Sequence, residues 1–254
     1  MQEGIRVSID GPVARITLHR PPLNVLTTAM LRDLAEAFDT AAADAEVRIV
    51  RLDAEGKVFC AGVDVADHAG DALAPMMDAL VAFVDAVERV PMPTVSVVHG
   101  AALGGGCEVM LATDLCLASE SASFGLPEIR LGVFAPPASV LLPRIVGERR
   151  ALAMLLTGAA VRAAEAEGMG LVNQVFPSEG FDDAVDEWFE RMLSLSGAAL
   201  RHAKRAVLVA RGKPVGEAHR DLVRSYLNEL MKTEDAQEGI RSFLEKRPPE
   251  WKHR

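Results

Sequence analysis

The chain has 254 residues, of which 50% are hydrophobic, and this is long enough for one large α/β domain with a substantial core. It carries 27 basic and 36 acidic side chains, a formal net charge of −9, and no basic tract that could follow a nucleic-acid backbone, so nucleic acid is not expected as a partner. The sequence has neither an apolar run of about 18 residues nor a signal-peptide core, which predicts no membrane partner and a cytoplasmic location. The cysteines, Cys60, Cys107 and Cys116, form no Cys-x-x-Cys pair, which favours buried thiols, and we expect no metal.

The first half of the chain alternates between strand and helix patterns. In chain order we expect a hairpin of strands at 5–9 and 13–18, a helix from Thr27 or Thr28 to about Ala43, a strand at 47–52, a helix at about 73–89 and a buried strand at 94–100. Prolines stiffen the extended segment before the first helix and stop the second helix. This order is typical of an α/β fold.

The second half becomes entirely helical towards its end. We expect a strand at 115–118, a loop at 123–137, helices at 140–146 and 149–156 split near Gly147, a short helix at 163–168, a strand at 171–176, and from Phe181 onward helices that break near Ser196, Gly212 and Thr233. Helices with no sheet to cover often pack across a subunit interface. We therefore divide the chain into a core of residues 1–190 and a helical oligomerisation region of residues 191–254.

Three consecutive glycines, Gly104–Gly106, follow the buried strand and open a predicted helix. The first amides of a helix have no intrahelical partner and lie at the positive end of its dipole, so the turn suits a developing negative charge. Glu108 lies on the same helix face as Gly105, and an anion site beside a carboxylate indicates enolate chemistry. The alternative is that the glycines only permit close packing of a helix on a sheet.

Two other segments also allow both a functional and a purely structural interpretation. Lys57–Val65 is a second turn rich in small residues, and it is either a ligand contact or a tight turn at a strand end. Glu128 stands in the predicted loop between Pro127 and Ile129, an unusual place for a solvated carboxylate, although a surface or capping role is the alternative.

Taken together, several segments resemble the crotonase family, also called the enoyl-CoA hydratase/isomerase superfamily. They are Arg20–Asn24, Phe59–Asp64, Gly100–Glu108, Phe124–Glu128 and Phe243–Arg247, in this order. The resemblance implies a ClpP/crotonase-like α/β spiral of ββα repeats with a C-terminal helical region that builds trimers or hexamers made of two trimers. It also implies an acyl-CoA substrate and no separate cofactor, because the substrate is carried as a coenzyme A thioester.

The resemblance assigns roles to four positions. It implies that the backbone amides of Val63 and Gly105 bind the thioester oxygen and that Glu108 and Glu128 flank the double bond. The chemistry agrees, since a preorganised donor to an enolate oxygen typically contributes about 3 to 4 kcal/mol. Two carboxyls close together in an apolar pocket have their pKa values pushed apart, as an acid and a base require. Family isomerases often keep only one acid here, so the pair favours a hydratase.

By the same resemblance, coenzyme A is bound by five residues, Ala61, Asp64, Val65, Phe243 and Lys246. The last two match positions that contact the nucleotide in relatives, including across a subunit interface. The alternatives to a hydratase are an enoyl-CoA isomerase, a decarboxylase or a hydrolase of the same superfamily, and a non-catalytic acyl-CoA-binding homologue.

Within the family, Ala61–His68, Gly132–Pro137 and Leu244–Trp251 look most like the cyclohexa-1,5-dienecarbonyl-CoA hydratases. Ordinary family hydratases have a glycine-rich loop after the second glutamate, where this chain has Pro136 and Pro137. We expect these prolines to form a stiff wall of the acyl pocket and to favour a cyclic dienoyl-CoA. His68 either lines this pocket or belongs to a solvated loop.

Overall fold

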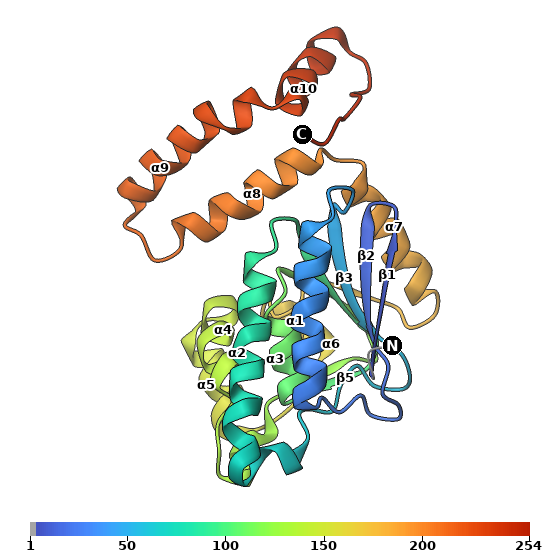
Figure 1. Cartoon of the computed structure of the whole chain (residues 1–254), viewed down its shortest axis with the longest axis vertical. Coiled ribbons are helices and arrows are strands. Elements are labelled where there is room, and N and C mark those ends of the chain that lie inside the picture. The colour runs from blue at the N-terminus through green and yellow to red at the C-terminus, as the bar shows by residue number, and fades with distance from the viewer. Residues whose placement is uncertain (1–3) are drawn as a thin grey trace. The chain divides into compact units, whose positions relative to one another are not determined.

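The structure, a computed structural model, describes residues 4–254. Contacts between residues divide the chain into two compact units, of which the second consists of Pro91–Pro93 and Glu187–Arg254 and the first of the rest. The first unit combines strands and helices, and the second is helical (Figure 1). Within residues 4–254 no helix is both long and apolar enough to cross a membrane.

The larger sheet of the first unit has the strand order β1-β2-β3-β4-β6-β9. Its strands are β1 (Ile5–Asp10), β2 (Val13–Leu18), β3 (Ile49–Ala54), β4 (Thr94–Val98), β6 (Leu115–Ser119) and β9 (Gln174–Phe176). The predicted hairpin is confirmed, because β1 and β2 are antiparallel and Asp10 pairs with Val13 across the turn. The later pairings are parallel. β3 begins two residues later than predicted, at Ile49, because its pairing with β2 begins there.

Two long helices, α1 (Thr28–Ala43) and α2 (Leu73–Arg89), lie side by side (Figure 1) and confirm the predicted helices. The Thr27 hydroxyl caps α1 by accepting a hydrogen bond from the Met30 amide at 3.2 Å. Phe38 and Phe83 are fully buried, and their ring centroids lie 5.7 Å apart in an edge-on arrangement that links α1 to α2. Burying each such side chain typically stabilises a fold by about 1.5 to 3 kcal/mol.

A smaller sheet of β5 (Ala101–Leu103), β7 (Ser123–Gly125) and β8 (Val161–Arg162) carries the glycine turn. The short strand β5 was not predicted, because its three residues continue the apolar run of β4. The chain leaves β5 at Gly104 with a φ of 53°, a left-handed conformation that favours glycine. Helix α3 (Gly105–Leu111) follows at once, as the glycine run predicts.

The segment 123–137, predicted as a loop, contains regular structure instead. β7 is followed by the 3₁₀ helix η3 (Pro127–Leu131), and helix α4 (Pro136–Val146) begins at the two prolines. Proline is tolerated in the first turn of a helix, where no amide hydrogen is needed for the helical ladder. The prediction of a proline loop was therefore wrong. Gly147 separates α4 from α5 (Glu148–Thr157) as predicted, and α6 (Ala163–Gly168) follows.

Helix α7 (Phe181–Leu193) begins in the first unit and ends in the second. The predicted domain boundary near residue 190 lies within this helix, and this boundary remains a prediction. The second unit continues with α8 (Gly197–Ala210), α9 (Val215–Asn228), the 3₁₀ helix η4 (Leu230–Lys232) and α10 (Glu234–Glu245), so the predicted helix breaks are confirmed. After α10 the chain folds back within this unit, where the Trp251 indole donates a hydrogen bond to the Ser194 carbonyl at 2.9 Å.

Candidate active site

Two backbone segments approach each other closely in the first unit. The Cys60 amide donates to the Ala101 carbonyl at 3.0 Å, and the Leu103 amide donates to the Cys60 carbonyl at 2.9 Å. These bonds place residues 60–65 beside β5 and the start of α3. A Cβ atom on Gly106 would lie 2.6 Å from the Cβ of Cys60, so this approach requires glycine there.

The amides of Val63 and Gly105 lie where the two segments meet. A Cβ atom on Gly105 would lie 3.2 Å from the Val63 nitrogen and 2.3 Å from its Cγ2. Within residues 4–254, neither amide donates a hydrogen bond to a protein acceptor. Because one of them is also the first amide of a helix, the pair can bind an oxygen that carries negative charge.

Glu108 is held in the interior by α3, and its exposed fraction is 3%. Its Oε1 accepts a hydrogen bond from the Ala138 amide of α4 at 3.1 Å. Burial raises the pKa of Glu108 to about 8, with a further increase from the charge of Glu128 and an opposing contribution from the Ala138 amide. A carboxyl with this pKa is mostly protonated at pH 7 and can act as an acid.

Glu128 reaches the same place from η3. A Cβ atom on Gly104 would lie 2.9 Å from its Oε1, so the carboxyl packs against the glycine turn. Its Oε2 is buried and has no hydrogen-bond partner among residues 4–254. Burial raises the pKa of Glu128, while its own backbone amide and His68 lower it. The structure thus brings the two predicted carboxyls and the two predicted amides together around Gly104 and Gly105.

A short 3₁₀ helix, η1 (Val65–His68), places His68 near this cluster. Asp64 caps η1 by accepting from the Ala66 amide at 3.1 Å, and Asp67 ties it to α1 by accepting from the Thr28 amide at 3.0 Å. Nδ1 of His68 lies 3.1 Å from the Asp64 carbonyl oxygen, which orients the exposed ring. The ring lies close enough to Glu128 to contribute to the electrostatics of that carboxyl.

The predicted coenzyme A contacts fall in both units. Ala61, Asp64 and Val65 adjoin the amide pair in the first unit, and the Val65 side chain is 66% exposed. Phe243, 81% exposed, and Lys246, exposed with a φ of 55°, lie at the end of α10 in the second unit.

Sequence reasoning missed Asn24 and Ala138 as supporting residues. Asn24 is fully buried in a left-handed conformation with a φ of 51°, and its Nδ2 lies 3.1 Å from the carbonyl oxygens of both Val58 and Phe59. It thereby fixes the chain that leads into the amide pair. Its place in the Arg20–Asn24 segment was a usable signal, whereas nothing in the sequence marks Ala138.

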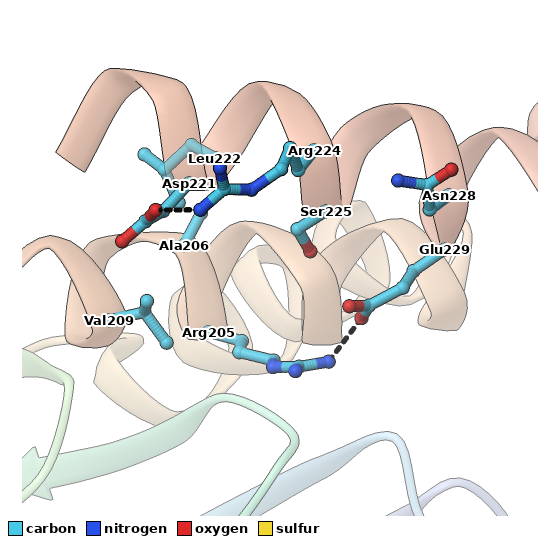
Figure 2. A pocket seen from close by; sticks show the side chains of 9 residues that line it. All are labelled: Arg205, Ala206, Val209, Asp221, Leu222, Arg224, Ser225, Asn228 and Glu229. Atoms are coloured by element: carbon cyan, nitrogen blue, oxygen red, sulfur yellow. Dashed lines mark hydrogen bonds and ion pairs between the residues drawn. The ribbon is translucent and has the colours of Figure 1, made fainter. Parts of the chain in front are cut away.

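A separate hollow of about 380 Å³ lies between α8 and α9 in the second unit (Figure 2). Its charged side chains are paired with each other, Arg205 with Glu229, and Arg224 with Asp221 at 2.6 Å (Figure 2). It contains none of the predicted site residues and offers no buried carboxyl for acid-base chemistry. Among residues 4–254, no group of at least three His, Cys, Asp or Glu side chains is placed to hold a metal ion.

Comparison with known proteins gives a family-model match, described as enoyl-CoA hydratase/isomerase, over residues 8–254. A cyclohexa-1,5-dienecarbonyl-CoA hydratase of Thauera aromatica is 38% identical over 246 residues, which cover 96% of this chain and 95% of the relative. A 2,3-dehydroadipyl-CoA hydratase of Escherichia coli K12 is 34% identical, with 98% of both chains covered. The crystal structure of an enoyl-CoA hydratase of Mycobacterium smegmatis superposes with a TM-score of 0.92 at 34% identity over 98% of both chains. These matches confirm the predicted fold class.

Proposed function

Because the chain belongs to the enoyl-CoA hydratase/isomerase family and is an enzyme of the hydro-lyase type, we propose that it adds water to an unsaturated acyl-CoA thioester, or removes it. The observation that carries this proposal is a pair of carboxyls, the buried Glu108 and the half-buried Glu128 with its buried Oε2, beside two amides without a protein acceptor among residues 4–254. Two carboxyls with raised pKa values cost folding free energy, and a site that only binds gains nothing from both.

The proposed reaction follows from this arrangement. The thioester oxygen accepts hydrogen bonds from the amides of Val63 and Gly105, which stabilise the negative charge that develops as water attacks the β-carbon. One carboxyl accepts a proton from the water while the other donates a proton to the α-carbon, so that a C–O bond and a C–H bond form and the C=C double bond is consumed. Passing the proton between the carboxyls restores the starting state.

Product analysis tests this proposal against its alternatives. We would incubate the protein with a panel of cyclic, branched and linear enoyl-CoA esters and determine product masses. A hydratase adds the mass of one water, an isomerase leaves the mass unchanged, a decarboxylase removes carbon dioxide and a hydrolase releases free coenzyme A. No turnover of any ester would favour the non-catalytic acyl-CoA-binding homologue and would overturn the proposal.

We further propose that the acyl group is a cyclic dienoyl group. The 38% identity to the Thauera aromatica enzyme supports this, as does Phe134, which is 67% exposed in the segment between Glu128 and α4 and offers a flat apolar surface. We expect at least tenfold higher kcat/KM for cyclohexa-1,5-dienecarbonyl-CoA than for crotonyl-CoA, which corresponds to about 1.4 kcal/mol. Equal or higher efficiency with crotonyl-CoA would refute the cyclic assignment.

We also propose a homotrimer, or a hexamer of two trimers, held by the helices after residue 190. Apolar side chains that are at least half exposed on α8 and α9 support this, namely Val207, Val215, Tyr226 and Leu227. A monomer in light scattering at micromolar concentration would contradict it. If Phe243 and Lys246 contact coenzyme A, Lys246→Ala should raise KM more than it lowers kcat.

A further inference from the structure

The direction of the Val63 amide follows from an isolated parallel β-bridge between Val63 and Leu26. In this bridge the Leu26 amide donates to the Gly62 carbonyl at 2.9 Å. The Leu26 carbonyl in turn accepts from the Asp64 amide at 2.8 Å. In a parallel pairing, the residue between two bonded neighbours points its own amide away from the partner chain. The Val63 amide therefore faces away from Leu26, and its nitrogen would lie 3.2 Å from a Cβ atom on Gly105.

A buried thiol holds the residue that precedes Val63. Cys60 is fully buried, and its Sγ accepts a hydrogen bond from the Gly62 amide at 3.4 Å and donates one to the Asn24 carbonyl at 3.0 Å. Burial raises the pKa of the Cys60 thiol to about 12, so the thiol keeps the proton that the second bond requires. The thiol therefore joins Gly62 to the backbone of Asn24.

Asn24 is a fixed anchor because its side chain is bonded at both its oxygen and its nitrogen. Its Oδ1 accepts from the Arg20 amide at 2.8 Å. Its Nδ2 lies 2.8 Å from the Glu55 carbonyl oxygen and 3.1 Å from the carbonyl oxygens of Val58 and Phe59. A fully buried amide side chain that uses its acceptor and its donors in this way is held in one orientation. A group bonded to the Asn24 backbone is therefore held in place as well.

We propose that Cys60 is a positioning residue for the Val63 amide, which it aims at the thioester oxygen by holding Gly62 in place. The inference rests on the proposed function, because the amide acts on a thioester oxygen in that reaction. Cys60 is fully buried, so it acts through the backbone and does not touch the substrate. The other amides of this segment donate to protein acceptors, namely those of Cys60, Ala61, Gly62 and Asp64. In the described part of the chain, the Val63 amide is the one that residues 60–64 leave for a ligand.

The experiment compares Cys60→Ala with Cys60→Ser on a bound ester that cannot be hydrated. The thioester carbonyl stretch of butanoyl-CoA, isotopically labelled at this carbonyl, is followed by difference infrared spectroscopy. Hydrogen bonds to a carbonyl lower its stretching frequency, so binding to the wild-type protein should lower it. Cys60→Ala removes both bonds of the thiol and should give a smaller lowering. Cys60→Ser keeps a donor and an acceptor and should restore the wild-type lowering.

Kinetics and a matched control separate positioning from binding and from general loss of packing. Loss of one ordinary hydrogen bond at the anchor should lower kcat of Cys60→Ala about three- to tenfold, while KM changes less. Cys116→Ala is the control, because Cys116 is 4% exposed in β6 and its Sγ lies 3.9 Å from the carbonyl oxygen of the adjacent Leu117. It removes a similarly buried thiol and should change neither the carbonyl stretch nor kcat.

The proposal would be overturned by a wild-type carbonyl stretch and kcat in Cys60→Ala, or by no recovery of either in Cys60→Ser. An equal loss in Cys116→Ala would also overturn it, because removal of any buried thiol would then disturb the site. Failure of the proposed function gives a different result, since bound butanoyl-CoA would show no lowered stretch even in the wild-type protein. That result would remove the oxyanion site itself and, with it, both proposals.

Discussion

The substitution Gly105→Ala tests the amide pair through geometry alone. Gly105 has no positive φ, so its backbone accepts alanine without strain. The added Cβ would lie 2.3 Å from Cγ2 of Val63. Carbon atoms in contact lie about 3.5 Å apart, so the two atoms must separate by about 1.2 Å. Rotation of the Val63 side chain cannot relieve all of it, because the Val63 nitrogen would lie 3.2 Å from the new atom.

The expected loss follows from this displacement. Loss of one donor to a developing oxyanion typically costs about 2.7 to 4 kcal/mol, which is about a hundredfold or more in rate. We therefore expect kcat of Gly105→Ala to fall by about a hundredfold or more. The assay is the loss of enoyl thioester absorbance, with binding of a saturated acyl-CoA measured separately by calorimetry and folding by circular dichroism.

Gly168→Ala is the matched control, because Gly168 ends α6 and a Cβ atom there has nothing within 4 Å. We expect it to keep wild-type turnover and to gain up to about 1 kcal/mol of stability, the usual advantage of alanine in a helix. If Gly105→Ala also kept wild-type turnover, the amides of Val63 and Gly105 would not form the oxyanion site, and the reasoning from their close approach would be refuted.

Three further expectations concern the carboxyls. Glu108→Gln and Glu128→Gln should each lower kcat by about a hundredfold or more while acyl-CoA binding persists, and near wild-type turnover in either would exclude that residue as acid or base. Burial raises the pKa of Glu108 from 4.5 to about 8, so the folded chain loses stability as the pH rises from 4.5 to about 8. Over this pH range, chemical denaturation should show the free energy of unfolding of Glu108→Gln rising relative to wild type by up to about 4 kcal/mol. A constant difference in unfolding free energy between the two proteins across this range would contradict this. His68→Ala should raise the pKa of Glu128 and move the acidic limb of the kcat/KM profile upward, and an unmoved limb would show that the imidazole charge does not act there.

Much of the fold is predictable because its signals are local. Alternation predicts β1 and β2, and the capping Thr27 and the apolar stripe of α1 lie within a few residues of one another. The start of α4 carries a weaker signal, since its N-cap is Ala135, which has no side chain that can accept from the helix. Two prolines are equally compatible with a loop and with a first helical turn, so tertiary contacts decide between them.

The chemistry of the candidate site depends on contacts between residues that are far apart in the sequence. The glycine run and the two glutamates are visible in the sequence, but the bond between Ala138 and Glu108 joins residues 30 positions apart. The influence of His68 on Glu128 likewise arises only when η1 folds beside η3. Sequence patterns predict which residues can do acid-base chemistry, whereas burial and long-range hydrogen bonds set the pKa values that decide which one is protonated.

The segment that folds back after α10 has a consequence for proteolysis. Asp235 is 2% exposed, and its carboxylate accepts hydrogen bonds from the Ser196 hydroxyl at 2.5 Å, the Lys252 amide at 2.6 Å and the His253 amide at 3.0 Å. A peptidase that removed residues 251–254 would leave this buried charge with one of its three donor groups, and a buried charge that loses its partners typically costs several kcal/mol. Cleavage before Trp251 is therefore expected to destabilise the start of α10, whose first turn contains Asp235.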